Sequence, residues 1–115
     1  MKYFKDSEFQ CPCCGKNEMN KPFCRKLDAA REIAGIPFKL NSAYRCKKHN
    51  NSVGGTEDSS HTKGLAADIY VFGTRERFLI LNALLSVGFN RIGIGKNFIH
   101  VDNDLSKDEE VVWLY

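Results

Sequence analysis

The stretch SSHTKGLAADIYV, residues 59–71, runs from a polar turn into an apolar strand. The place where the turn becomes a strand determines which side chains on either side of it can meet. Residues 64–71 predict a strand whose alternate side chains share a face, so that Asp68 points away from its apolar neighbours. Gly64 permits a tight turn before the strand, and His61 can fold back from that turn over Asp68. Taken alone the pair is weak evidence of a site, because a turn histidine and a loop-bonded carboxylate would give the same pattern.

A second strand is predicted at FIHVD, residues 98–102. Ile99 and Val101 can enter the core, which leaves His100 and Asp102 together on the opposite face. By itself this face is equally consistent with a solvated surface, or with a histidine that is hydrogen-bonded to its neighbouring carboxylate.

His61, Asp68 and His100 together supply two imidazoles and one carboxylate, a standard three-ligand set for catalytic zinc. Zinc in such a site lowers the pKa of water to about 7 and polarises an amide carbonyl. The combination therefore favours a hydrolase in which zinc-activated water is the nucleophile.

The periodicity of the remaining chain predicts helices in two blocks and strands that mostly follow one another. The expected helices are 21–34, a short one within 45–55 and 75–87, and the expected strands are 37–42, 64–71, 91–95, 98–102 and 111–115. This order predicts one α+β domain over residues 1–115, with a small antiparallel sheet, helices packed mainly on one side, and a cysteine-containing N-terminal segment 1–20.

The helix boundaries follow from capping residues. Asn20 is expected to cap the first long helix and Gly35 to end it. Thr74 is expected to cap the second, and its inward stripe is expected to be Phe78, Leu81, Leu84 and Leu85.

The composition argues against several classes of protein. The 115 residues include 17 Lys+Arg and 14 Asp+Glu, and the net charge of +3 is too small and too scattered to indicate nucleic-acid binding. No segment approaches the roughly 18 apolar residues of a membrane span, and the N-terminus has no apolar signal-peptide region. We therefore expect cytoplasmic synthesis, no membrane insertion and a monomer.

The pattern S-x-H-x-x-G-x-A-x-D at residues 59–68, followed by H-x-D at 100–102, resembles the zinc D-Ala-D-Ala carboxypeptidase family. That family includes the vancomycin-resistance D,D-peptidases and bacteriophage cell-wall peptidases, and it shares its fold with the hedgehog signalling domain. NSAYR at 41–45 and HNNSVGG at 49–55 are similar to further segments of the family. The resemblance spans about half of the chain and implies a hedgehog/D,D-peptidase-like fold.

The resemblance implies roles for individual residues. It implies His61, Asp68 and His100 as the zinc ligands, and Arg45 as the cation that binds the substrate carboxylate or steadies the developing oxyanion. A guanidinium suits this role, because it stays charged and can hold a carboxylate with two parallel hydrogen bonds. Ser59 is expected to bind substrate or to support the zinc ligands, with turn capping as the alternative.

The sequence departs from the family at the general base. Many members carry Glu or Asp three residues before the last histidine, where this chain has Asn97, and an amide cannot accept the proton. Asp102 is the expected replacement, and orienting the His100 imidazole is its competing role. Glu57 and Asp58 are further options.

The five cysteines suggest a different chemistry, beginning with CPCCGK at residues 11–16. A structural zinc could be held by Cys11, Cys14, Cys24 and Cys46, although a second close pair is missing, and free thiols or one disulfide are the alternatives. A zinc-ribbon nucleic-acid binder would also need a basic stripe, whereas acidic residues are interspersed throughout.

The sequence thus predicts a zinc metallopeptidase that cuts a peptide bond in peptidoglycan stem peptides, of the D-Ala-D-Ala carboxypeptidase or endopeptidase type. The missing signal peptide fits a bacteriophage endolysin released to the cell wall, or a virion component. The alternative is a non-catalytic zinc-containing module of the same fold that binds cell wall or protein, which Asn97 favours.

Overall fold

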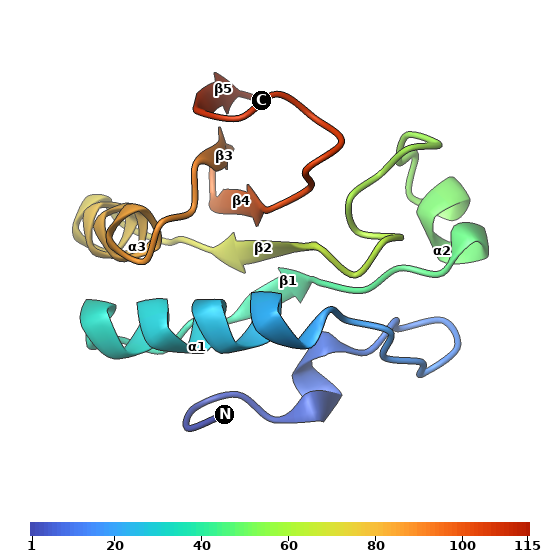
Figure 1. Ribbon diagram of the computed structural model, residues 1–115, viewed down its shortest axis with the longest axis horizontal. Helices are drawn as coiled ribbons and strands as arrows, with labels where there is room; N and C mark the ends of the chain where they lie inside the picture. The colour runs from blue at the N-terminus through green and yellow to red at the C-terminus, as the bar shows by residue number, and fades with distance from the viewer.

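The computed structural model describes all 115 residues and has an α+β architecture, as the sequence predicted (Figure 1). Its elements are the 3-10 helix η1 (Asp6–Phe9), α1 (Lys21–Ala34), β1 (Leu40–Ser42), α2 (Lys47–Ser52), β2 (Ala66–Tyr70), α3 (Thr74–Ser86), β3 (Arg91–Ile94), β4 (Phe98–Asp102) and β5 (Val111–Leu114). The five strands form one sheet in the order β1-β2-β4-β3-β5. None of the helices has the length and apolar character needed to cross a bilayer.

The sheet is mixed rather than wholly antiparallel, which corrects one detail of the predicted fold. β1, β2, β4 and β3 pair antiparallel, whereas β5 pairs parallel to β3, with Arg91 opposite Val111 and Gly93 opposite Trp113. Asp102 at the end of β4 lies opposite Arg91 at the start of β3, so residues 103–110 pass the N-terminal end of β3 and β5 begins beside its first residue (Figure 1). A guanidinium N–H of Arg91 donates to the carbonyl of Asp108 and ties this crossing in place.

The two faces of the central strands have different roles. On one face Ala67, Ile69, Ile99 and Val101 are completely buried in the hydrophobic core. The helices cover this face with Phe23, Leu27 and Ala30 from α1 and Ile80, Ala83 and Leu84 from α3. The opposite face of β2 and β4 is therefore free to carry polar side chains.

The predicted capping residues explain where α1 begins and ends. The prediction for α3 was partly wrong. The side chain of Asn20 accepts from the Phe23 N–H at 2.9 Å, and Gly35 ends α1 with φ 71°. In α3 the cap position is Gly73, with no side-chain cap bond from Thr74. Two of the expected inward residues, Phe78 and Leu85, are 65% and 50% exposed. Both lie about 150° around the helix from the buried Ile80, at 100° per residue.

Gly64 fixes the turn that precedes β2. Its φ is +71°, and an added Cβ would overlap the carbonyl oxygen of Glu18 in the N-terminal segment. The Gly64 carbonyl also accepts from the Asn20 N–H at 2.9 Å. Only glycine combines this left-handed backbone with so close an approach of two chain segments.

We expect Gly64→Ala to lower the free energy of unfolding by roughly 2 to 5 kcal/mol, the sum of left-handed strain and backbone overlap. Gly35→Ala is the matched control, because Gly35 has the same φ of +71° with nothing within 4 Å of an added Cβ. The control should lose only about 1 to 2 kcal/mol. Urea unfolding of both variants measures the difference, and equal losses would show that the Glu18 contact has no effect.

Candidate metal centre

The candidate centre lies on the face of β2 and β4 that α1 and α3 leave uncovered. It is the floor of a pocket whose lining includes Arg45, His61, Asp68, His100, Trp113 and Tyr115. Segments far apart in the chain meet there: the loop before α2, the turn before β2, and strands β2, β4 and β5.

The turn before β2 brings His61 to Asp68, as the spacing predicted. Three backbone hydrogen bonds tighten this turn: Thr62 N–H to the Ser59 carbonyl at 3.2 Å, Gly64 N–H to His61 at 3.3 Å and Leu65 N–H to Ser60 at 3.1 Å. The Nε2 of His61 then lies 3.3 Å from Oδ2 of Asp68, with the imidazole buried.

Strand pairing supplies the third group. Asp68 in β2 is directly opposite His100 in β4, and Nδ1 of His100 lies 2.8 Å from Oδ1 of Asp68. The donor atoms of His61, Asp68 and His100 all lie within 4.8 Å of one another. Ligand atoms of a tetrahedral zinc with bonds of about 2.0–2.1 Å lie roughly 3.4 Å apart. The three side chains therefore fit a zinc ion.

In the imidazoles of His61 and His100, the nitrogen that does not face Asp68 already has a hydrogen-bond partner. Nδ1 of His61 lies 2.7 Å from the carbonyl oxygen of Ala43, which can only accept, so this nitrogen carries the proton. Nε2 of His100 lies 2.7 Å from Oδ2 of Asp102 and donates to that carboxylate. In each ring the other nitrogen, which can bind a metal ion once it is deprotonated, faces Asp68. Metal-bound histidines are typically held in this way.

Electrostatics agree with a cation site. Burial alone would raise the pKa of Asp68, but hydrogen bonds from His100 and His61 outweigh it and hold this pKa well below its usual range. Burial alone would lower the pKa of His100, yet hydrogen bonds with Asp102 and Asp68 raise it. Both shifts show that the carboxylates on this face stabilise positive charge, either a proton on His100 or a metal ion in its place.

A comparison with known protein families gives a match to this chain. The sequence profile of the family described as Peptidase M15 matches residues 2–102, nearly all of the chain up to the end of β4. The chain belongs to the Peptidase M15 family. Peptidases of this family are zinc-dependent, so family and donor set agree. The predicted resemblance to zinc D-Ala-D-Ala carboxypeptidases is confirmed at the level of the family. A search of curated proteins found no match.

In this M15 peptidase, both carboxylate oxygens of Asp102 have hydrogen-bond partners. It is 1% exposed, Oδ1 accepts from Arg91 Nε at 2.6 Å and from the Asp104 N–H at 3.2 Å, and Oδ2 faces His100. Burial alone would raise the pKa of Asp102, but hydrogen bonds from His100 and Arg91 lower it. Of the two roles that the sequence left open, these contacts favour orienting the His100 imidazole.

Arg91 was missed by the sequence analysis. It is the cross-strand partner of Asp102 in the β3–β4 hairpin, and its guanidinium carbon lies 5.1 Å from the centre of the Trp113 ring. An always-charged guanidinium beside a buried carboxylate removes the cost of an unpaired charge. The register of the predicted hairpin was the signal that could have identified this pair.

Arg45 reaches the centre from the loop before α2. Its Nε donates to Ser42 Oγ at 2.9 Å and its Nη1 to Asn50 Oδ1 at 3.3 Å, while Nη2 lies 3.6 Å from Oδ2 of Asp68. The buried Asn50, which the sequence analysis did not single out, is itself fixed by donating to the Thr56 carbonyl at 2.8 Å. The guanidinium is therefore held at the edge of the metal centre.

The other predicted residues lie at different distances from the centre. Ser59 is buried at the pocket wall, where its Oγ accepts from the His61 N–H at 3.3 Å. This contact supports the turn that carries His61. Asn97, Glu57 and Asp58 are exposed and do not line the pocket.

Trp113 in β5 and Tyr115, the residue after this strand, form a wall of the pocket that the sequence analysis did not assign. The ring centres of Trp113 and Tyr115 lie 5.5 Å and 6.4 Å from that of His100. Gly93 makes this packing possible, because a Cβ there would overlap both aromatic rings. β5 lies beyond the residues that match the family.

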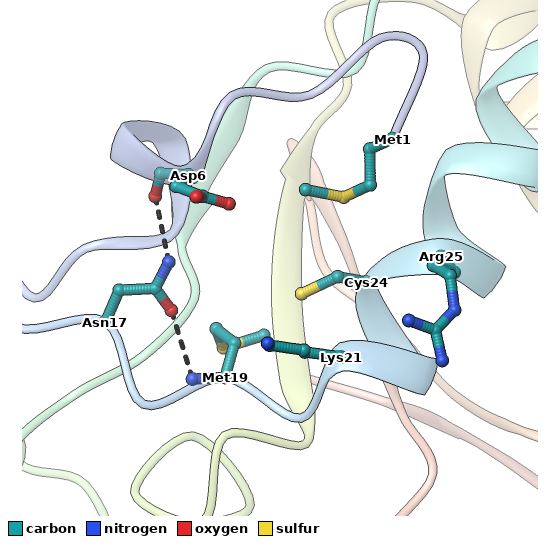
Figure 2. A pocket seen from close by; sticks show the side chains of 7 residues that line it. All are labelled: Met1, Asp6, Asn17, Met19, Lys21, Cys24 and Arg25. Atoms are coloured by element: carbon teal, nitrogen blue, oxygen red, sulfur yellow. Dashed lines mark hydrogen bonds between the residues drawn. The ribbon is translucent and has the colours of Figure 1, made fainter.

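The four cysteines that the sequence analysis considered for a second zinc, with free thiols or one disulfide as alternatives, do not all come together. Cys24 does not join the other cysteines. It lies on α1, 6% exposed, and lines a separate pocket with Met1 and Met19 (Figure 2). The reason is helical spacing: Cys24 precedes Leu27 by three residues, so both face the core. Burial accordingly raises the pKa of the Cys24 thiol to about 11.

Proposed function

We propose that this M15 peptidase hydrolyses a peptide bond in the stem peptides of peptidoglycan, as a D-Ala-D-Ala carboxypeptidase or an endopeptidase of that type. The observation that carries the proposal is the juxtaposition of a two-histidine, one-carboxylate centre with a fixed guanidinium at its edge. Such a pair can act on an amide bond that lies close to a carboxylate.

His61, Asp68 and His100 would hold the zinc ion. When bound, zinc supplies Lewis-acid polarisation of a carbonyl and activation of water. Ala43 and Asp102 keep the two imidazoles in the required tautomers. Because these contacts are buried and preformed, the donor set needs little reorganisation.

Arg45 is proposed to hold the substrate's terminal carboxylate. Bonds to Ser42 and Asn50 fix the guanidinium and leave Nη2 directed towards the centre. A fixed guanidinium loses little side-chain entropy when it binds.

Trp113 and Tyr115 are proposed to pack against the apolar methyl groups of a D-alanine stem and to keep water from that side of the pocket. Their rings stand beside His100 at the wall of the pocket. Aromatic walls with a few fixed polar groups are typical of small-ligand sites.

The proposed place of action is the cell wall, reached by phage-type release or as part of a virion, with the peptidoglycan stem peptide as partner and the chain acting as a monomer. This proposal rests on the family resemblance.

A non-catalytic zinc-containing binding module is the second candidate. The specific observation in its favour is that both carboxylates of the pocket are committed, Asp68 to the donor set and Asp102 to Arg91 and His100. Zinc-dependent binding to cell walls without release of any peptide product would support this candidate.

We expect Arg45→Lys to lower kcat/KM roughly 10- to 100-fold on a stem peptide with a free terminal carboxylate, because charge-assisted hydrogen bonds contribute about 1.5–3 kcal/mol. An otherwise identical peptide with an amidated C-terminus should be cut slowly by both forms, with little further loss in the variant. Arg25→Lys, an exposed position on α1, is the control. Equal losses on both peptides would contradict carboxylate binding and would assign Arg45 to the carbonyl oxygen.

A further inference from the structure

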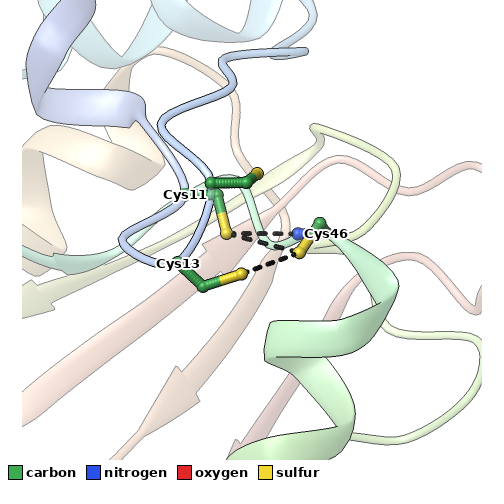
Figure 3. Close-up of side chains that lie close together, drawn as sticks. Cys11, Cys13 and Cys46 are labelled. Carbon is green, nitrogen blue, oxygen red and sulfur yellow. Dashed lines mark hydrogen bonds between the residues drawn. The ribbon is translucent and has the colours of Figure 1, made fainter.

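Four of the five cysteines come from two separate segments of the chain but lie close together in the fold. Cys11, Cys13 and Cys14 come from the N-terminal loop and Cys46 from the residue before α2, and their sulfurs all lie within 4.8 Å of one another. Figure 3 shows the side chains of Cys11 and Cys13 pointing towards that of Cys46. The proposed hydrolysis uses none of these thiols.

The sulfur separations fit a shared metal ion. Sγ of Cys46 lies 3.7 Å from that of Cys11 and 3.3 Å from that of Cys13. A disulfide would need about 2.05 Å, whereas four sulfurs bound to one zinc at about 2.3 Å lie roughly 3.8 Å apart. We propose that Cys11, Cys13, Cys14 and Cys46 bind a second zinc ion as a structural four-thiolate site.

The local backbone is shaped to present these sulfurs. In Cys-Pro-Cys-Cys-Gly the Gly15 N–H donates to the Cys11 carbonyl at 2.8 Å, and the Cys11 N–H donates to Lys16 at 2.8 Å. Gly15 has φ +71°, a left-handed conformation that closes the turn directly after Cys14. This tight turn holds three ligands that are almost consecutive in the chain.

Backbone N–H groups also point at the sulfurs. The Cys46 N–H donates to Sγ of Cys11 at 3.5 Å, and the His49 N–H donates to Sγ of Cys46 at 3.4 Å. Such donors stabilise the negative charge of metal-bound thiolates and orient them, as other outer contacts do in metal sites.

The site would connect the N-terminal segment to the catalytic pocket. Residues 1–20 contain only one 3-10 helix, so a metal can supply order that regular structure does not. Cys46 directly follows Arg45, whose backbone N–H donates to the His61 carbonyl at 3.2 Å. The second zinc therefore fastens the loop that positions Arg45.

Elemental analysis of the purified full chain tests the site. Wild type should hold two zinc ions per chain, and Cys46→Ser and Cys14→Ala should each hold one. Cys24→Ser is the matched control and should retain both. His100→Ala should also hold one, which separates the cysteine site from the histidine centre. A single zinc in wild type that is lost with His100→Ala would overturn the proposal.

Cobalt substitution of wild type keeps the test valid if a cysteine variant does not fold. Only thiolate ligands give the intense sulfur-to-cobalt charge-transfer absorption in the near ultraviolet, so wild type and His100→Ala should both show it. Cobalt-loaded wild type without this absorption, or a disulfide among the four cysteines, would overturn the site. Neither measurement depends on hydrolysis, so an inactive peptidase would leave the result unchanged.

Discussion

His61→Ala is expected to abolish zinc binding at the histidine centre and to lower kcat/KM by roughly a thousandfold or more. The reason is that Nε2 of His61 is one of three donor atoms, and no other side chain of the turn can replace it. Loss of Lewis-acid stabilisation worth several kcal/mol corresponds to about three powers of ten in rate. Zinc content and hydrolysis of a stem peptide, measured on the same preparation, check both parts.

His49→Ala is the matched control for this prediction. His49 is a half-buried histidine of α2 outside the donor set, so its replacement should leave zinc content and hydrolysis close to wild type. Full zinc content with undiminished hydrolysis in His61→Ala would refute the assignment of the ligands.

Asp102→Asn is expected to weaken zinc binding roughly 10- to 100-fold, the usual effect of losing a group that orients a metal ligand. The amide keeps the shape of Asp102 but cannot accept in the same way from both Arg91 and His100. Once zinc is saturating, kcat should recover to near the wild-type value. A zinc titration followed by kcat at each concentration measures the two effects separately.

The opposite pattern would restore the other role of Asp102. If zinc affinity stays unchanged while kcat remains low at saturating zinc, Asp102 accepts the proton of the reaction instead of orienting His100. Urea unfolding must accompany the assay, since removal of the carboxylate charge leaves Arg91 buried and without its ion-pair partner.

Much of the metal centre was predictable because it depends on short-range geometry. Alternation along a strand places Asp68 on one face of β2 and both His100 and Asp102 on the same face of β4. The return of His61 over Asp68 depends only on a tight turn that Gly64 allows. These relations are local, so they do not depend on how the remaining chain folds.

The parts that sequence reasoning missed depend on long-range arrangement. Trp113 and Tyr115 reach the pocket because the chain passes the N-terminal end of β3 and β5 then pairs parallel to that strand, and no local pattern encodes this connection. The sequence analysis considered one four-cysteine set from spacing alone, which could not show that Cys13 rather than Cys24 faces Cys46. The orientation of α1 decides that point, since it directs Cys24 into the core.

The most direct test of the proposed function is product analysis by mass spectrometry with zinc-loaded wild type and a purified peptidoglycan stem peptide that ends in D-Ala-D-Ala. We predict zinc-dependent cleavage of a peptide bond of the stem, prevented by a chelator and absent in His61→Ala. An intact stem peptide after incubation with wild type whose histidine centre holds zinc would contradict the account and would favour the non-catalytic binding module.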